Sequence, residues 1–189
     1  MSTPVTVTPG TTLFVVDPAH TQVQFAVRHL MISTVRGSFK DVQGTVQLDQ
    51  SNTARAAVDI RVNIGSIDTR EPKRDAHLKS PDFFDAERFP VMTLQGRRVI
   101  GSIDSDFKLV GDLTIRDVTR TVVLDVVPEG RGMDPWGNER AGFSATAKIS
   151  RGEFGLKWNQ ALETGGVVVG DEVKISIDVE LVKQAAAVA

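Results

Sequence analysis

The sequence predicts an all-β protein, an antiparallel up-and-down β-barrel of about eight strands with a short helical segment covering one end. Apolar and polar residues alternate with a period of two along most of the chain, which is typical of strands with one buried face. Turns rich in Gly, Asp and Ser separate these runs, and only residues 66–90 break the alternation with a helical pattern. So many alternating strands with so little helix favour a closed barrel over a sandwich.

Each alternating run is a predicted strand with its apolar side chains on one face. Alternation begins at Leu13, and the last run is the most regular. Because the charged face of each strand must meet water, the apolar face points into the barrel. The predicted strands after the first are residues 22–29, 42–49, 56–63, 91–100, 107–115, 122–126, 143–149 and 172–181.

The helical pattern of residues 66–90 has clear boundaries. Thr69 or Glu71 can cap a short helix with Pro72 in its first turn, and Pro81 ends it after about two turns. A helix of this length is marginal in water unless it packs on something. Two interpretations stay open: a crossover loop docked on the core, or a lid over an apolar cavity.

The sequence defines the segment 150–171 and the barrel interior less sharply. Residues 150–171 are Gly-rich, and Trp158 and Leu162 could form an irregular cover there. Small inward residues such as Gly44 and Ala147 favour a hollow interior, although a barrel of about eight strands can also be filled by its side chains.

Composition excludes several classes of protein. The chain of 189 residues has 41% hydrophobic and 24% charged residues, as globular proteins do, and its net charge of −2 gives no basic footprint for nucleic acid. The absence of cysteine excludes disulfides and thiol nucleophiles. The sequence contains no apolar run of 18 residues, so no membrane-spanning helix is predicted. The first dozen residues hold no Lys, Arg or apolar core of a signal peptide, so we expect a cytoplasmic protein.

One domain is expected from this length. The predicted division is an N-terminal arm at residues 1–12, a single barrel domain at residues 13–183 and a C-terminal tail at residues 184–189.

His29 is the most notable polar residue of the predicted strands. It shares the parity of Phe25 and Val27, so its imidazole points inward if the strand extends that far. Such a group either bonds a backbone carbonyl or solvent, or contacts the polar head of a ligand at the cavity mouth. Arg36 and Lys40 could add positive charge for a phosphate, or could belong to a solvated face.

No pattern predicts a metal, a cofactor or a catalytic centre. The three histidines and nearby aspartates have no recognised ligand spacing such as His-x-x-x-His. Residues 142–146 lack the second glycine of a nucleophile elbow, and no Gly-rich phosphate loop leads into a helix.

Four ordered blocks carry a resemblance to a known family. They are DPAHTQVQFAVRH (residues 17–29) followed by VRGSF (35–39), RDAHLKSPDFFD (74–85) followed by FP (89–90), GDLTIRDVTR (111–120), and GDEV (170–173). From about Phe14 to Val182 the chain resembles the YceI-like family of lipocalin-like, polyisoprenoid-binding proteins. Asp117 stands where the family often has Gly, which changes only a turn, and the secretion signal of many relatives is not seen here.

The resemblance implies an extended lipocalin-like barrel with an elongated apolar pore, no catalytic residues and often a homodimer. It also implies a bound isoprenoid lipid, such as a polyprenyl phosphate or a quinone-like molecule, and no other cofactor. The leading hypothesis is therefore a non-enzymatic carrier or store of such a lipid. The alternative is an enzyme that acts on an isoprenoid lipid or another small amphiphile.

The predicted site is the inward apolar surface together with two polar contacts. The predicted head-group contacts are His29 and Arg36. The predicted lipid-binding residues are Phe25, Val27, His29, Phe39, Val46, Ile60, Phe83, Phe84, Met92, Leu94, Phe107, Leu109, Leu113, Phe143, Ile175 and Ile177.

Overall fold

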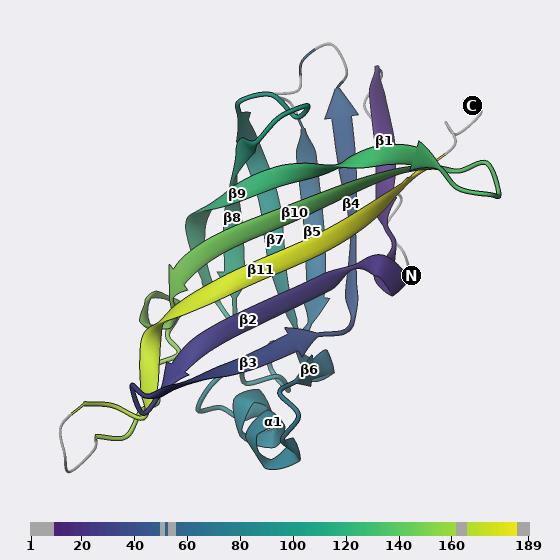
Figure 1. Ribbon diagram of the computed structural model, residues 1–189. Coiled ribbons are helices and arrows are strands. Elements are labelled where there is room, and N and C mark those ends of the chain that lie inside the picture. The colour runs from purple at the N-terminus through teal and green to yellow at the C-terminus, as the bar shows by residue number, and fades with distance from the viewer. Residues whose placement is uncertain (1–9, 50–51, 53–55, 162–165, 185–189) are drawn as a thin grey trace.

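The strands of the molecule form one antiparallel sheet that closes on itself (Figure 1). The structure is a computed structural model, and it describes residues 10–49, 52, 56–161 and 166–184. Its strands are β1 (Thr11–Val16), β2 (Gln22–His29), β3 (Ser33–Phe39), β4 (Val42–Asp49), β5 (Ala57–Asn63), β6 (Ile67–Asp68), β7 (Val91–Ile100), β8 (Phe107–Ile115), β9 (Val118–Met133), β10 (Glu139–Ser150) and β11 (Val169–Lys183). The helices are α1 (Pro72–Lys79) and the 3₁₀ turns η1 (Pro18–His20), η3 (Ile64–Ser66) and η4 (Arg151–Phe154).

Eight of these strands make the closed barrel. They pair in the order β1, β4, β5, β7, β8, β9, β10 and β11, and β11 returns to β1 through the pairs from Phe14↔Lys183 to Val16↔Leu181. The first half of β11 pairs instead with β2, which continues the sheet into β3 and β6. The predicted all-β barrel with about eight strands and one helix is confirmed.

The twisted sheet folds into two crossing layers. In Figure 1, β9, β10, β11, β2 and β3 lie in front of β4, β5, β7 and β8. The two inner faces meet in one apolar core. Its most buried members include Phe14, Val42, Ile64, Ala141 and Leu181, each no more than 2% exposed.

Besides the two-residue strand β6, the sequence analysis missed β3. Its residues include Gly37 and Ser38, which are poor strand formers. The pairing of Gly37 with Phe25 explains the glycine, because a Cβ atom there would lie 2.4 Å from Cζ of Phe25. The ring of Phe25 on the neighbouring strand therefore requires a glycine at this position of β3.

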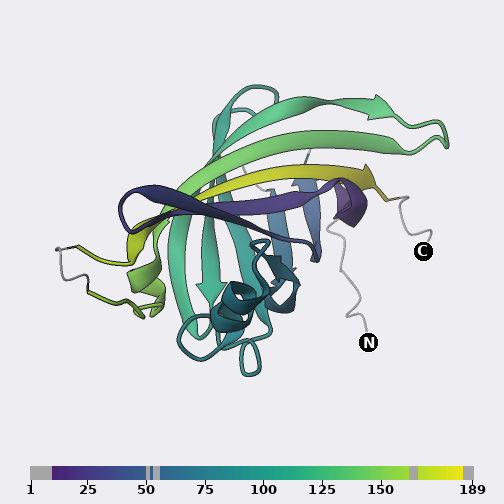
Figure 2. The ribbon, with the colours of Figure 1, turned by 60° about the horizontal axis from the view of Figure 1, so that its bottom comes forward.

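Two strands are longer than the alternation predicted. β9 pairs with β8 only as far as Val126↔Phe107, and beyond this point β9 and β10 continue as a hairpin that projects past the barrel (Figure 2). Within this extension nearly all of the β9 residues are exposed, so no alternation marks it on that strand, whereas Ala141 of β10 is buried. Trp136 at its tip is 79% exposed.

The predicted helix is present with the expected boundaries. Glu71 is its N-cap and accepts a hydrogen bond from the backbone N of Lys73 at 3.1 Å, while Pro72 occupies the first turn. Ser80 is the C-cap, directly before Pro81. In the described part of the chain, no helix has the length and apolar character needed to span a membrane.

Candidate functional site

The segment from Thr69 to Pro90, here called the lid, covers one end of the barrel. Its start is tied down by the Asp75 carboxylate, which accepts hydrogen bonds from the backbone N of Thr69 at 2.9 Å and from its Oγ1 at 2.6 Å. The Arg74 guanidinium donates to Oγ1 and to the carbonyl oxygen of Thr69. These bonds fix the short helix α1 across the end of the barrel that Figure 2 brings forward.

Aromatic side chains attach the lid to the barrel. Phe84 meets Phe39 of β3 edge-on, with ring centroids 5.9 Å apart. Phe83 is only 7% exposed and packs on Trp158 at 5.3 Å. Arg116, in the turn between β8 and β9, donates a hydrogen bond to the carbonyl oxygen of Phe83 at 3.3 Å. The lid is therefore held to the barrel by aromatic contacts together with the hydrogen bond from Arg116.

Trp158 confirms part of the expected irregular cover. It belongs to the segment between β10 and β11 and packs against both His77 and Phe83 of the lid. Leu162, the other residue expected there, lies outside the described residues.

Two apolar cavities lie inside the barrel. The one beneath the lid, here called the lid cavity, has a volume of about 160 Å³ and is lined in part by Leu78, Phe83 and Phe84. The second, here called the far cavity, has a volume of about 120 Å³ and extends toward Val16 and Leu181 at the closing pair of strands. The interior is therefore hollow, but as two chambers.

The two cavities are neighbours that share part of their walls. Five residues line both of them, and these five are here called the waist. The two chambers therefore adjoin one another, with aliphatic side chains between them. The waist consists of Val23, Ile60, Leu94, Leu124 and Ile177.

Most of the predicted lipid-binding residues line these cavities. Those in the lid cavity are Phe25, Val27, Phe39, Ile60, Phe83, Phe84, Met92, Leu94, Leu113, Ile175 and Ile177. Those that line only the far cavity are Val46, Phe107, Leu109 and Phe143. The structure thus brings fifteen of the sixteen together around one interior; the role of each in binding stays a prediction.

The two predicted head-group contacts lie elsewhere. His29 ends β2, is half-buried, and is not among the residues that line either cavity. Arg36 pairs with Ala26 and points to the outer face of β3, because its neighbours Val35 and Gly37 take the opposite face. The prediction for these two residues therefore has no support from their position.

Arg36 belongs to an open groove on the outer face of the sheet. The groove measures about 910 Å³ and has both basic and acidic walls. Arg36, Lys174 and Lys148 lie in one cross-strand row, with Ala26 between the first two. Within the groove Lys40 pairs with Asp68 at 2.5 Å, and Lys148 lies 3.8 Å from Glu172 outside it. This face is a solvated, partly neutralised surface on the other side of the cavity wall.

Arg151 is the functional candidate that the sequence analysis missed. It follows β10 directly, is 7% exposed and lines the lid cavity. Its Nε donates to the carbonyl oxygen of Gly170 at 2.8 Å, and its Nη1 donates to the carbonyls of Leu156 and Trp158. Its Nη2 donates to the carbonyl of Val169 at 3.2 Å. The sequence did contain a signal for this position. Residues two apart on a strand face the same side, so Arg151 is expected to point inward as Ile149 does.

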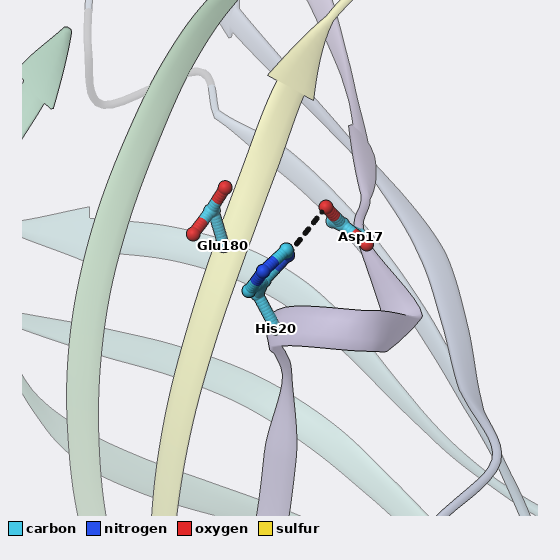
Figure 3. A group of neighbouring side chains, drawn as sticks. All are labelled: Asp17, His20 and Glu180. Atoms are coloured by element: carbon cyan, nitrogen blue, oxygen red, sulfur yellow. Dashed lines mark hydrogen bonds and ion pairs between the residues drawn. The ribbon is translucent and has the colours of Figure 1, made fainter. Parts of the chain in front are cut away.

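A second polar cluster lies at the start of the barrel, where η1 meets β11. The Oδ2 atom of Asp17 and the Nδ1 atom of His20 are 2.9 Å apart, and the Glu180 carboxylate faces them from β11 (Figure 3). One ligand atom from each lies within 4.8 Å of the others, as a metal site requires. However, the Nη1 atom of Arg140 binds both carboxylates, at 2.7 Å from Asp17 Oδ2. A guanidinium in this position supplies the positive charge, so the cluster fits an ion-pair network better than a cation site.

The network continues into the projecting hairpin. The Nε atom of Arg140 lies 2.8 Å from Oδ2 of Asp134, whose carboxylate also accepts from the backbone N of Trp136 and Asn138. The hydrogen bond from His20, followed by that from Arg140, lowers the pKa of Asp17 to about 2. Burial opposes the ionised form of Asp134, but the bonds from Asn138 and Arg140 outweigh it and hold its pKa below the usual value. The same pair with Asp17 raises the pKa of His20.

The geometry defines a class of protein: an antiparallel β-barrel with an apolar interior in two chambers and a short helix over one end. The YceI-like domain model matches residues 14–181. A UPF0312 protein of Staphylococcus aureus strain USA300 is 37% identical over 170 residues, which is 89% of this chain and 96% of that protein. The chain belongs to the YceI-like family.

Solved structures share the fold. The YceI protein of Campylobacter jejuni has a TM-score of 0.71 at 31% identity, covering 84% of this chain and 90% of its own. BcnA of Burkholderia cenocepacia has a TM-score of 0.75 at 22% identity, covering 87% of this chain and 98% of its own. A polyisoprenoid binding domain from Saccharophagus degradans has a TM-score of 0.64 at 11% identity, covering 90% and 98%. The family and fold expected from the four sequence blocks are confirmed.

Proposed function

We propose that this protein binds a polyisoprenoid or similar long-chain amphiphilic lipid inside its barrel and carries or stores it without chemical change. The observation that supports this most is the interior itself. Two adjoining cavities are walled almost entirely by aliphatic and aromatic side chains. Such a surface gives affinity through burial of an apolar tail, at about 25 cal/mol per Å² removed from water.

The shape of the interior favours a long, thin ligand. The lid cavity and the far cavity follow one another and meet at the waist. Their volumes are small beside the 300 to 1,000 Å³ or so typical of ligand pockets. A long chain would therefore enter by displacing the lid and parting the waist side chains, and would then occupy both chambers.

The family supports the same ligand class. A structural neighbour bears the name polyisoprenoid binding domain, and the chain shares its fold. Catalysis has less support, because the polar groups gathered in the described residues form ion pairs and caps rather than a nucleophile with its base.

Mass spectrometry of an organic extract of the purified protein tests the proposal. We expect a prenyl lipid in near-stoichiometric amount, because a tail of roughly 40 carbons at about 0.3 kcal/mol per heavy atom gives an affinity that survives chromatography. A larger side chain at the waist provides the control. Leu94→Trp should block the passage between the two cavities and reduce the amount of extracted lipid while the barrel still folds.

Two outcomes would contradict the proposal. Extracts free of lipid, together with no binding of added prenyl lipids of several lengths, would make the interior a plain core. Chemical conversion of an added lipid by the pure protein would favour the alternative of a lipid-acting enzyme.

The proposal includes a cytoplasmic homodimer. These two features come from the sequence and the resemblance. Cell fractionation tests the compartment, and light scattering of the purified protein tests the oligomeric state.

A further inference from the structure

We infer that Arg151 receives the anionic head group of the lipid, so that the ligand lies with its head beneath the lid and its tail in the far cavity. This inference rests on the proposed function and deepens it. It assigns the head-group contact to a residue of the cavity wall rather than to His29 or Arg36.

The first argument is the charge that Arg151 brings into an apolar chamber. It is the one charged residue among the described residues that line either cavity. A buried cation is costly unless an opposite charge compensates it. No ion pair of Arg151 is found within the described ranges; the Asp171 carboxylate acts on it through space but accepts its hydrogen bonds from the Ser150 side chain and the backbone N of Gly152. A ligand anion would supply the direct ion pair that Arg151 lacks.

The second argument is the remaining hydrogen-bonding capacity. A guanidinium has five N–H groups. The four bonds of Arg151 to carbonyl oxygens use the Nε–H, both Nη1–H groups and one Nη2–H. One N–H of Nη2 is left for an acceptor. The four carbonyls also fix the side chain in place, so it would bind a phosphate oxygen without losing further rotamer freedom.

The third argument is the position of Arg151 along the interior. It lines the lid cavity together with Phe83 and Phe84 of the lid and is absent from the wall of the far cavity. The far cavity is lined by apolar residues and Thr21, so it offers nothing that would hold a charged group. A charged head therefore has one favourable place, next to the movable end of the barrel.

The test compares two ligands with the same tail, geranylgeranyl phosphate and geranylgeraniol, by equilibrium dialysis at neutral pH. We expect wild type to bind the phosphate at least about 10-fold more tightly, as a charge-assisted hydrogen bond implies. In Arg151→Gln the two ligands should bind alike, with the affinity for the alcohol changed less than about 3-fold. Arg151→Lys, which keeps the charge, should retain part of the preference for the phosphate.

The controls separate this role from a purely structural one. If Arg151 acts only through its contacts with the carbonyls, Arg151→Gln should lower the affinity for both ligands equally, and this result would overturn the inference. An unchanged preference for the phosphate in Arg151→Gln would also overturn it. Arg36→Gln should behave as wild type, and loss of the preference in this variant would move the head-group site to the outer groove. If Arg151→Gln fails to fold, the binding of the two ligands to wild type decides. Equal affinity for the phosphate and the alcohol refutes the inference but leaves lipid binding standing. Binding of neither ligand refutes the proposed function.

Discussion

The two ends of the barrel are closed in different ways. At the lid end, Phe83 packs on Trp158, and Phe84 packs on Phe39 of β3. At the other end, Arg140 joins carboxylates from η1, the hairpin and β11 into one ion-pair network. The lid end adjoins a cavity, whereas the network holds the strands that close the sheet.

This difference separates opening from stability. Apolar contacts have no strict geometry, so a lid held by them can shift and re-form during ligand entry. Charge-assisted hydrogen bonds are directional and hold one arrangement. We therefore expect the proposed ligand to enter at the lid end without loosening the closure of the sheet at the other end.

The largest effect is expected when a charge is placed in the apolar end. Phe83→Asp would bury an unpaired carboxylate and should lower the free energy of unfolding by on the order of 5 kcal/mol, or prevent folding. Ala76→Asp places the same residue at an exposed position of α1 and should cost less than about 1 kcal/mol. Urea denaturation measures both, and equal effects would show that the lid is not packed on the core.

Truncation of the lid aromatics should affect ligand release more than stability. Phe83→Ala should cost about 3 kcal/mol of stability and should speed release of a bound prenyl lipid, because it removes packing that closes the cavity. Phe14→Ala is the matched control, since Phe14 is as buried but lines neither cavity. Stopped-flow displacement measures release. Similar release rates in the two variants would leave the lid as a plain crossover.

Much of the barrel follows from the alternation of residues, and the reason is physical. Side chains on a strand face opposite sides, so Ile175 and Ile177 had to point inward once Lys174 and Ser176 were placed in water. The helix followed equally well, because Pro72 and Pro81 act locally. Such features depend on neighbours in the sequence, and sequence reasoning recovers them.

The features that were missed depend on contacts between distant residues. Arg140 and Asp17 are 123 positions apart, and nothing in either neighbourhood marks them as partners. The parity of Ile149 predicts only an inward direction for Arg151; its burial depends on the carbonyls of Val169 and Gly170, which are 18 and 19 positions away and which no periodic pattern marks as partners. Arg36 was predicted as a head-group contact for the same reason: its outward direction depends on β3, a strand that the sequence analysis did not predict.

Removal of the Arg140 guanidinium should weaken the dependence of stability on acid at the ion-pair network. In wild type the pKa of Asp17 is lowered to about 2, so its contribution to stability is present above about pH 4 and is lost as the pH falls toward 2. Arg140→Met removes one hydrogen-bond donor from Asp17 and from Asp134, which keep their bonds from His20 and Asn138, so the pKa values of these two carboxyls should be lowered less than in wild type. This variant should be less stable than wild type at pH 7, and the difference in stability between the two should narrow as the pH falls toward 2. Arg131→Met, an exposed position of the same hairpin, should follow wild type.

His20 should give the smallest effect, because its side chain is 61% exposed and salt screens its pair with Asp17. The hydrogen bond and charge of Asp17 raise the pKa of His20, so the folded protein holds this proton more tightly than the unfolded chain. Its contribution is therefore complete below about pH 6.5 and is lost as the pH rises through the raised pKa. The urea midpoint of wild type should fall slightly between pH 6 and pH 8, and His20→Gln should remove that slope while leaving the release rate of a bound lipid unchanged. A change in lipid release on this substitution would mean that the two ends are coupled, and the separation of opening from stability would fail.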